Sequence, residues 1–186
     1  MNKANSQSAT IWLTGLSASG KSTLGQALKN DLILQGISRV CLLDGEVLRA
    51  GLDQKLGHGL EDRFRMLHYI VDRVQKEREN GFTTIVSTIS HKREMRDYAR
   101  ERLAPFMEVY LSCPTDVCAI RDTKGHYRRA FAGEYEYFVG VTDNYEPSDA
   151  PELILETSTM SMELSRERLL RAVLGFLDSE RCLSGY

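Results

Sequence analysis

The sequence has 186 residues, which is enough for one domain, residues 1–186, built on a single substantial hydrophobic core. A formal net charge of −2 excludes the broad positive surface of a general nucleic-acid binder or of a protein held on anionic membranes. The four cysteines show no C-x-x-C spacing, and no long apolar segment follows the polar N-terminal residues. We therefore expect a cytoplasmic protein without a signal peptide or membrane span, and with a mobile tail over residues 1–8.

The first predicted elements are a buried strand, a glycine-rich loop and a helix. Ile11 to Leu13 form a short apolar run, and apolar residues recur at helical spacing from Leu24 to Ile33. Between them, residues 15–22 read Gly-Leu-Ser-Ala-Ser-Gly-Lys-Ser and fit G-x-x-x-x-G-K-[ST] at every position. The alternative is a glycine-rich turn that matches by chance. The flanking strand and helix favour a loop whose N–H groups, together with the helix N-terminus, cradle phosphate.

This loop predicts ATP as the phosphoryl donor and Mg²⁺ as the metal cofactor. Lys21 would place a positive charge beside the β- and γ-phosphates, and the Ser22 hydroxyl would bind Mg²⁺. The predicted ATP-binding residues of the loop are Gly15, Ser17, Ala18, Ser19, Gly20, Lys21, Ser22 and Thr23.

A second strand is predicted from Val40 to Leu43, directly before Asp44. In open α/β sheets ligands bind beyond the carboxyl ends of the strands, so Asp44 is a candidate catalytic residue and a candidate ligand of Mg²⁺. An ordinary turn aspartate is the alternative interpretation. The glycines between Arg49 and Gly59 predict irregular structure there.

A long helix is predicted from about Leu60 to Glu79, with an apolar stripe along one side. Arg63, Met66 and Ile70 lie along one edge of that stripe at helical spacing. This edge is either the wall of a pocket, or a place where Arg63 covers apolar surface with its stem and reaches water with its head.

Three further strand-like runs, residues 83–87, 107–111 and 153–155, alternate with helical patterns, and an amphipathic helix follows from about Leu164 to Leu177. Polar residues from 88 to 93 follow the first of these runs, again at a strand end. The alternation predicts an α/β fold of the P-loop NTPase type, with a parallel sheet of about five strands covered by helices on both faces.

Residues 121–149 combine basic and aromatic side chains with glycines and show no sustained apolar stripe. Such a composition predicts a mobile, cationic lid that closes over phosphates and stacks on a base. A solvated loop with ordinary charges is the alternative, although long loops in compact domains are usually functional or disordered.

Together these motifs resemble the adenylylsulfate kinase family, from Ile11 to about Thr157. The phosphate loop is similar to that family's version over Gly15 to Thr23. The other segments, with the family patterns that they resemble, are 43–49 (D-G-D-N-x-R), 62–63 (D-R), 121–127 (R-D-P-K-G-L-Y), 145–147 (Y-E-x-P) and 150–152 (A-P-E).

The resemblance implies a cytoplasmic enzyme of sulfate assimilation that transfers the γ-phosphoryl group of ATP to the ribose 3′-hydroxyl of adenylyl sulfate (APS), giving PAPS. It implies that Asp44 assists the acceptor hydroxyl, that Lys21 acts on the donor, and that Arg121 contacts ATP. It implies small-molecule nucleotide partners, no nucleic acid or membrane, and a homodimer. The implied acceptor-binding residues are Arg49, His58, Arg63, Met66, Ser90, Lys124 and Phe138.

Four departures from the family pattern concern the acceptor side. Met66 stands where the family has an asparagine, His58 where it has an aromatic residue, Glu136 where it has a lysine, and Glu46 where it has an aspartate. A carboxylate near an anionic acceptor would be unfavourable unless that acceptor differs. One alternative is therefore a kinase for a related nucleotide, such as cytidine diphosphoramidate in surface-polysaccharide modification. A catalytically inactive, nucleotide-binding regulatory protein is the alternative of another class.

Overall fold

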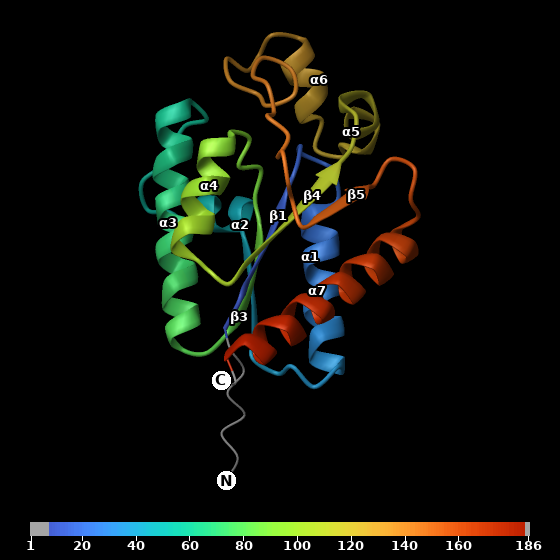
Figure 1. Cartoon of the computed structure of the whole chain (residues 1–186). Helices are drawn as coiled ribbons and strands as arrows, with labels where there is room; N and C mark the ends of the chain where they lie inside the picture. The colour runs from blue at the N-terminus through green and yellow to red at the C-terminus, as the bar shows by residue number, and fades with distance from the viewer. Residues whose placement is uncertain (1–7, 185–186) are drawn as a thin grey trace.

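The computed structural model describes residues 8–184 and contains a five-stranded, fully parallel sheet in the order β2-β3-β1-β4-β5 (Figure 1). This confirms the predicted α/β fold. Residues 1–7, most of the predicted tail, lie outside the described residues. The strands are β1 (Thr10–Thr14), β2 (Val40–Asp44), β3 (Thr83–Ser87), β4 (Phe106–Ser112) and β5 (Leu153–Glu156).

Helices cover both faces of the sheet, as predicted (Figure 1). Helices α1 and α7 lie on one face, and α3 and α4 lie on the other. Within residues 8–184, no helix combines the length and the apolar character needed to cross a bilayer. The helices are α1 (Lys21–Leu34), α2 (Gly45–Ala50), α3 (Leu60–Glu79), α4 (Arg93–Arg102), α5 (Thr115–Arg121), α6 (His126–Phe131) and α7 (Met162–Ser184).

Strand β1 is the centre of the fold because all five of its residues are buried. Alternate residues of a strand point to opposite faces of the sheet, so different side chains of β1 pack into the two cores. Ile11 and Leu13 contribute to the core shared with α1 and α7, whereas Trp12 contributes to the core shared with α3 and α4. Each such side chain stabilises the fold by about 1.5–3 kcal/mol. This packing holds the phosphate loop, which follows β1 directly.

The segment after β2 differs from the sequence expectation. The structure has a helix, α2, before the irregular stretch predicted from Arg49, because the Asp44 carboxylate accepts hydrogen bonds from the backbone N–H groups of Glu46 and Val47 and caps the helix. Asp44 is the last residue of β2 as well as this N-cap. The glycine-rich stretch therefore begins only after Ala50.

The predicted lid segment, residues 121–149, carries more regular structure than its composition suggested. It contains the last residue of α5, all of α6 and an isolated bridge between Val139 and Asp143. Tyr127 and Ala130 of α6 are buried, so two turns of this segment have an apolar side after all. The segment lies beyond the carboxyl ends of β1 and β4, where Figure 1 shows α5 and α6 above the sheet. Its mobility stays a prediction.

Candidate functional site

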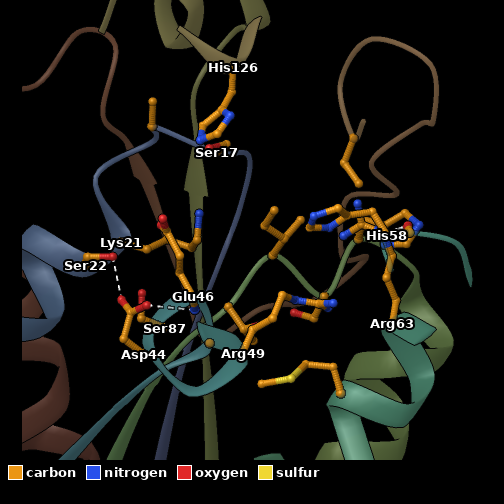
Figure 2. A pocket seen from close by; sticks show the side chains of 18 of the residues that line it. Ser17, Lys21, Ser22, Asp44, Glu46, Arg49, His58, Arg63, Ser87 and His126 are labelled. Carbon is orange, nitrogen blue, oxygen red and sulfur yellow. Dashed lines mark hydrogen bonds between the residues drawn. The ribbon is translucent and has the colours of Figure 1, made fainter. Parts of the chain in front are cut away.

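The carboxyl ends of the central strands open into a cavity of about 740 Å³, in the upper part of the range for ligand pockets (Figure 2). The phosphate loop and Asp44 line one end, the start of α3 lines the other, and the lid supplies residues between positions 121 and 139. Figure 2 shows Lys21, Ser22 and Asp44 together, with Arg49 extending toward His58 and Arg63 at the opposite end.

The phosphate loop keeps its shape because glycine is required at its start. Gly15 has φ +145°, and a Cβ at that position would lie 2.6 Å from the backbone oxygen of Leu111. Lys21 Nζ donates hydrogen bonds to the carbonyls of Gly15 (3.0 Å) and Leu16 (2.6 Å). The loop is thus closed around the lysine, with its charge held beside the loop backbone.

Burial changes the chemistry of Lys21. Its side chain lies almost entirely inside the protein, and this desolvation lowers its pKa from 10.5 to about 8, with Cys118, Asp44 and Glu46 opposing the shift. An anionic phosphate beside the ammonium group would favour the charged form again. An anionic ligand would therefore stabilise the charged form of Lys21, which burial disfavours in the free protein.

Ser22 and Asp44 bring two oxygen donors together at this end of the cavity. Ser22 Oγ lies 2.6 Å from Asp44 Oδ2 and donates a hydrogen bond to it. A hydroxyl and a carboxylate suit Mg²⁺, which prefers oxygen ligands and is usually held by one or two protein groups plus phosphates and water. Among the described residues there is no cluster of three or more His, Cys, Asp or Glu side chains that could hold a metal by itself.

A side chain from the lid reaches across to the same end. Lys124 forms an ion pair with Glu46, the second residue of α2, and both line the cavity. Both side chains are more than half exposed, so the pair contributes little to stability. Its consequence is geometric: it holds the lid against helix α2, which follows Asp44 directly.

The other end of the cavity is cationic. Arg49 Nη1 donates a hydrogen bond to the Gly57 carbonyl (2.6 Å), and Arg63 Nε donates one to the His58 carbonyl (2.7 Å). Neither guanidinium forms an ion pair with any residue in the described part of the chain. Burial and the nearby Arg49 charge lower the pKa of Arg63, and burial together with the two arginines lowers that of His58. Asp62 and Asp143 act on Arg49 and Arg63 respectively, but neither carboxylate is in ion-pair contact with them, so this end of the cavity suits an anion.

The cavity wall includes apolar residues of α3 and a serine whose backbone is held by hydrogen bonds. Met66 is only 4% exposed and lines the cavity with Ile70, so the predicted edge of α3 does face a pocket. Ser90 Oγ accepts a hydrogen bond from the Trp12 indole N–H (3.0 Å), and the Ser90 carbonyl accepts one from Arg96 (2.6 Å). These contacts hold Ser90 at φ +36°, a conformation that needs support in a residue other than glycine.

Aromatic side chains of the lid also line the cavity. The rings of Tyr135 and Phe138 are stacked with centroids 5.7 Å apart, and the Tyr135 hydroxyl lies 3.0 Å from His126 Nδ1. Both rings line the cavity, as does Tyr137. Flat apolar faces next to a cationic pocket suit a nucleobase attached to an anionic chain.

Most residues proposed from the sequence line this one cavity. Gly15 and Ser19 do not; they lie beneath the loop surface, where the Ser19 carbonyl accepts a hydrogen bond from Thr157 Oγ1. Glu136 is exposed and is not among the described residues that line the cavity; it lines a smaller neighbouring hollow with Lys92 and Asp143. The proposed residues that line it are Ser17, Ala18, Gly20, Lys21, Ser22, Thr23, Asp44, Arg49, His58, Arg63, Met66, Ser90, Arg121, Lys124 and Phe138.

Several lining residues were not proposed from the sequence. His91 follows β3 in the polar run that did attract attention, and His126 and Tyr135 belong to the lid. The aromatic content of the lid was the available signal for Tyr135. No spacing rule singles out His91, whose imidazole is fully buried and lies 2.7 Å from the Asp143 carboxylate.

Comparisons with known proteins agree with this geometry. A model of the family described as adenylylsulphate kinase matches residues 7–156. The adenylyl-sulfate kinase of Microcystis aeruginosa is 40% identical over 84% of this chain and 86% of its own length. That of Bacillus pumilus is 40% identical over 90% of this chain and 86% of its own.

Solved structures give the same result. The APS kinase of Mycobacterium tuberculosis, solved in complex with AMPPNP and APS, superimposes with a TM-score of 0.84 at 32% identity. The match covers 90% of this chain and 98% of that one. Because the family match spans well over half of the sequence, the chain belongs to the adenylylsulphate kinase family of phosphotransferases.

Proposed function

We propose that this protein transfers the γ-phosphoryl group of ATP to the ribose 3′-hydroxyl of adenylyl sulfate. One observation carries the proposal: a single cavity joins a phosphate loop to a pair of arginines that form no ion pair within the described residues, with Asp44 on its wall. The phosphate loop suits the polyphosphate of a donor, and the two arginines suit an anionic acceptor nucleotide. Membership of the family and the relatives named adenylyl-sulfate kinase support this choice of acceptor.

The residues of the chain divide the work as follows. N–H groups of the loop and Lys21 hold the donor phosphates, while Arg49 and Arg63 hold the anionic part of the acceptor. The acceptor oxygen forms a bond to the γ-phosphorus, the bond from that phosphorus to the β–γ bridging oxygen breaks, and ADP leaves. Asp44 takes the proton of the acceptor hydroxyl or orients that hydroxyl for attack.

Mg²⁺ fits the donor end. Ser22 and Asp44 would hold the ion, and its charge would offset the negative charge on the transferring phosphoryl group. A homodimer in the cytoplasm is also proposed, and light scattering of the purified protein measures the oligomeric state.

The position of Met66 supports a second candidate acceptor, cytidine diphosphoramidate. A thioether that is nearly buried in the cavity wall offers neither a good hydrogen-bond donor nor a strong acceptor at the position where the family has an asparagine. The decisive assay therefore supplies ATP at fixed concentration with adenylyl sulfate or cytidine diphosphoramidate, and identifies the phosphorylated product. Faster turnover of the cytidine compound, measured as kcat/KM, would overturn the proposed acceptor and leave the kinase chemistry intact.

A further inference from the structure

A small apolar cluster joins the phosphate loop to the lid. Its centre is formed by Cys113, Cys118 and Tyr127, all buried. Burial raises the pKa of the Cys118 thiol to about 12, so this sulfur is an unreactive packing group. The residues that pack against the centre come from the phosphate loop, from helix α5 and from the lid: Leu16, Ala18, Val117, Ala119, Phe138 and Val141.

Tyr127 holds the loop through its hydroxyl. Its Oη donates a 3.1 Å hydrogen bond to the carbonyl of Ser17, and the side chain is fully buried. Burial raises the pKa of this phenol, which therefore keeps its proton for the bond. In a trans peptide the N–H points away from the carbonyl, so holding the Ser17 carbonyl fixes the direction of the Ala18 N–H. Ala18 has φ +59°, a strained conformation that depends on such support.

The ring of the same tyrosine supports the acceptor end. Tyr127 and Phe138 meet edge to face, with centroids 4.8 Å apart and an interplanar angle of 78°. Leu16 of the loop packs in the same cluster as Phe138 and Val141, and the turn is so close that a Cβ added at Gly140 would lie 3.1 Å from Leu16 Cδ2. The lid turn that carries Phe138 thus packs directly on the phosphate loop.

We propose that Tyr127 is a positioning residue that couples the two ends of the cavity. Nucleotide binding fixes the peptide between Ser17 and Ala18, the hydroxyl transmits that order to α6, and the ring sets Phe138 for the acceptor. The coupling is reciprocal: if nucleotide bound at the loop strengthens acceptor binding at Phe138, then the acceptor must strengthen nucleotide binding by the same free energy. The assignment of donor and acceptor ends rests on the proposed function.

The test compares Tyr127→Phe, which removes only the hydroxyl, with Tyr98→Phe on the outer helix α4. Calorimetry measures binding of a non-hydrolysable ATP analogue, and hydrogen exchange measures protection of residues 134–143 with and without it. We expect Tyr127→Phe to bind the analogue about two- to tenfold more weakly, as for loss of one buried hydrogen bond. We also expect it to lose the analogue-induced protection of residues 134–143, which wild type and Tyr98→Phe retain.

Unchanged analogue affinity together with unchanged protection of residues 134–143 would overturn the coupling. A second measurement needs no variant: adenylyl sulfate alone should protect the amides of residues 15–20 in the wild-type protein. Binding of adenylyl sulfate without that protection also contradicts the coupling. Absence of any binding of adenylyl sulfate contradicts the proposed acceptor instead, and leaves the analogue experiment to decide on Tyr127.

Discussion

Ser22 Oγ donates a 2.6 Å hydrogen bond to Asp44 Oδ2, and this contact joins the first turn of α1 to the end of β2. The other carboxylate oxygen accepts hydrogen bonds from the backbone N–H groups of Glu46 (2.9 Å) and Val47 (3.3 Å). Asp44 is therefore both a capping residue and a charged group at the donor end of the cavity. One oxygen of this side chain caps α2, and the functional role proposed for Asp44 would use the other, which faces Ser22.

This double contact makes Asp44→Asn an informative variant. Asparagine caps helices about as well as aspartate, so the free energy of unfolding should change by less than about 1 kcal/mol. Loss of the charge should lower kcat by about two to three decades and weaken the response to added Mg²⁺. Steady-state assays over a range of Mg²⁺ concentrations measure both effects. Asp116→Asn on α5 is the control, and a kcat close to wild type for Asp44→Asn would remove this residue from the mechanism.

Replacing Lys21 tests whether the protein is a catalyst at all. Lys21→Ala removes the charge that is hydrogen-bonded to the loop carbonyls of Gly15 and Leu16, so kcat should fall by about two to three decades while the fold is kept. Circular dichroism checks the fold, and release of ADP measures turnover. Lys29→Ala on the same helix is the control and should behave as wild type. Undiminished turnover in Lys21→Ala would overturn the proposed mechanism, and the regulatory, non-catalytic alternative would be favoured only if Asp44 were dispensable too.

The donor end was largely predictable from the sequence because its residues are contiguous or lie at strand ends. Fifteen amino acids around the phosphate loop specify a strand, a turn and a helix start locally, and the sheet order then places Asp44 beside Ser22. The spacing of Arg63 and Met66 on one helix likewise predicted a shared edge, which faces the cavity. Such features follow from local periodicity and from one topological rule.

The remainder depends on contacts between distant segments, which no local pattern encodes. His91 and Asp143 are 52 residues apart, and Glu136 does not line the cavity although its neighbours Tyr135 and Tyr137 do. Helix α2 was missed because its cap is the same aspartate that was assigned to catalysis. The residues of the acceptor end could therefore be predicted from the resemblance, but which charged side chains line it could be seen only in the structure.

The buried imidazole of His91 predicts a specific loss of stability in acid. Burial lowers its pKa from 6.5 to about 4, with Arg63 and Lys92 adding to the shift and Asp143 opposing it. Between these two values the unfolded chain binds the proton more readily, so the free energy of unfolding falls as the pH drops from 6.5 to 4. The contribution of this one group is at most about 3 kcal/mol. Urea unfolding at several pH values should show a shallower decline for His91→Asn than for wild type.

His68→Asn is the control for that experiment, because His68 is exposed on α3. It should keep the wild-type decline between pH 6.5 and 4. If His91→Asn lost stability in acid as steeply as His68→Asn, the imidazole would not be the group responsible.

Met66 reports on the acceptor. If adenylyl sulfate is the natural acceptor, the wall around Met66 already suits it, and Met66→Asn should give equal or lower kcat/KM with adenylyl sulfate. The variant should also be less stable, by about 1–3 kcal/mol, since it buries an amide in a site that now holds a thioether. Met66→Leu keeps the apolar surface and is the control. A gain of activity toward adenylyl sulfate in Met66→Asn would instead indicate that the pocket has diverged toward another acceptor.

Arg63 gives the sharpest test of the acceptor end, because a neighbour on the same helix provides a matched control. Arg63 lines the cavity and has no ion-pair partner among the described residues, whereas Arg65 points outward and pairs with Glu61 at 2.6 Å. Arg63→Ala should raise the acceptor KM and lower kcat/KM by about one to two decades, the cost of one charge-assisted hydrogen bond. The KM for ATP should hardly change, because the phosphate loop holds the donor. Arg65→Ala should leave both constants unchanged, and an Arg63→Ala variant that altered only the ATP parameters would place the acceptor elsewhere.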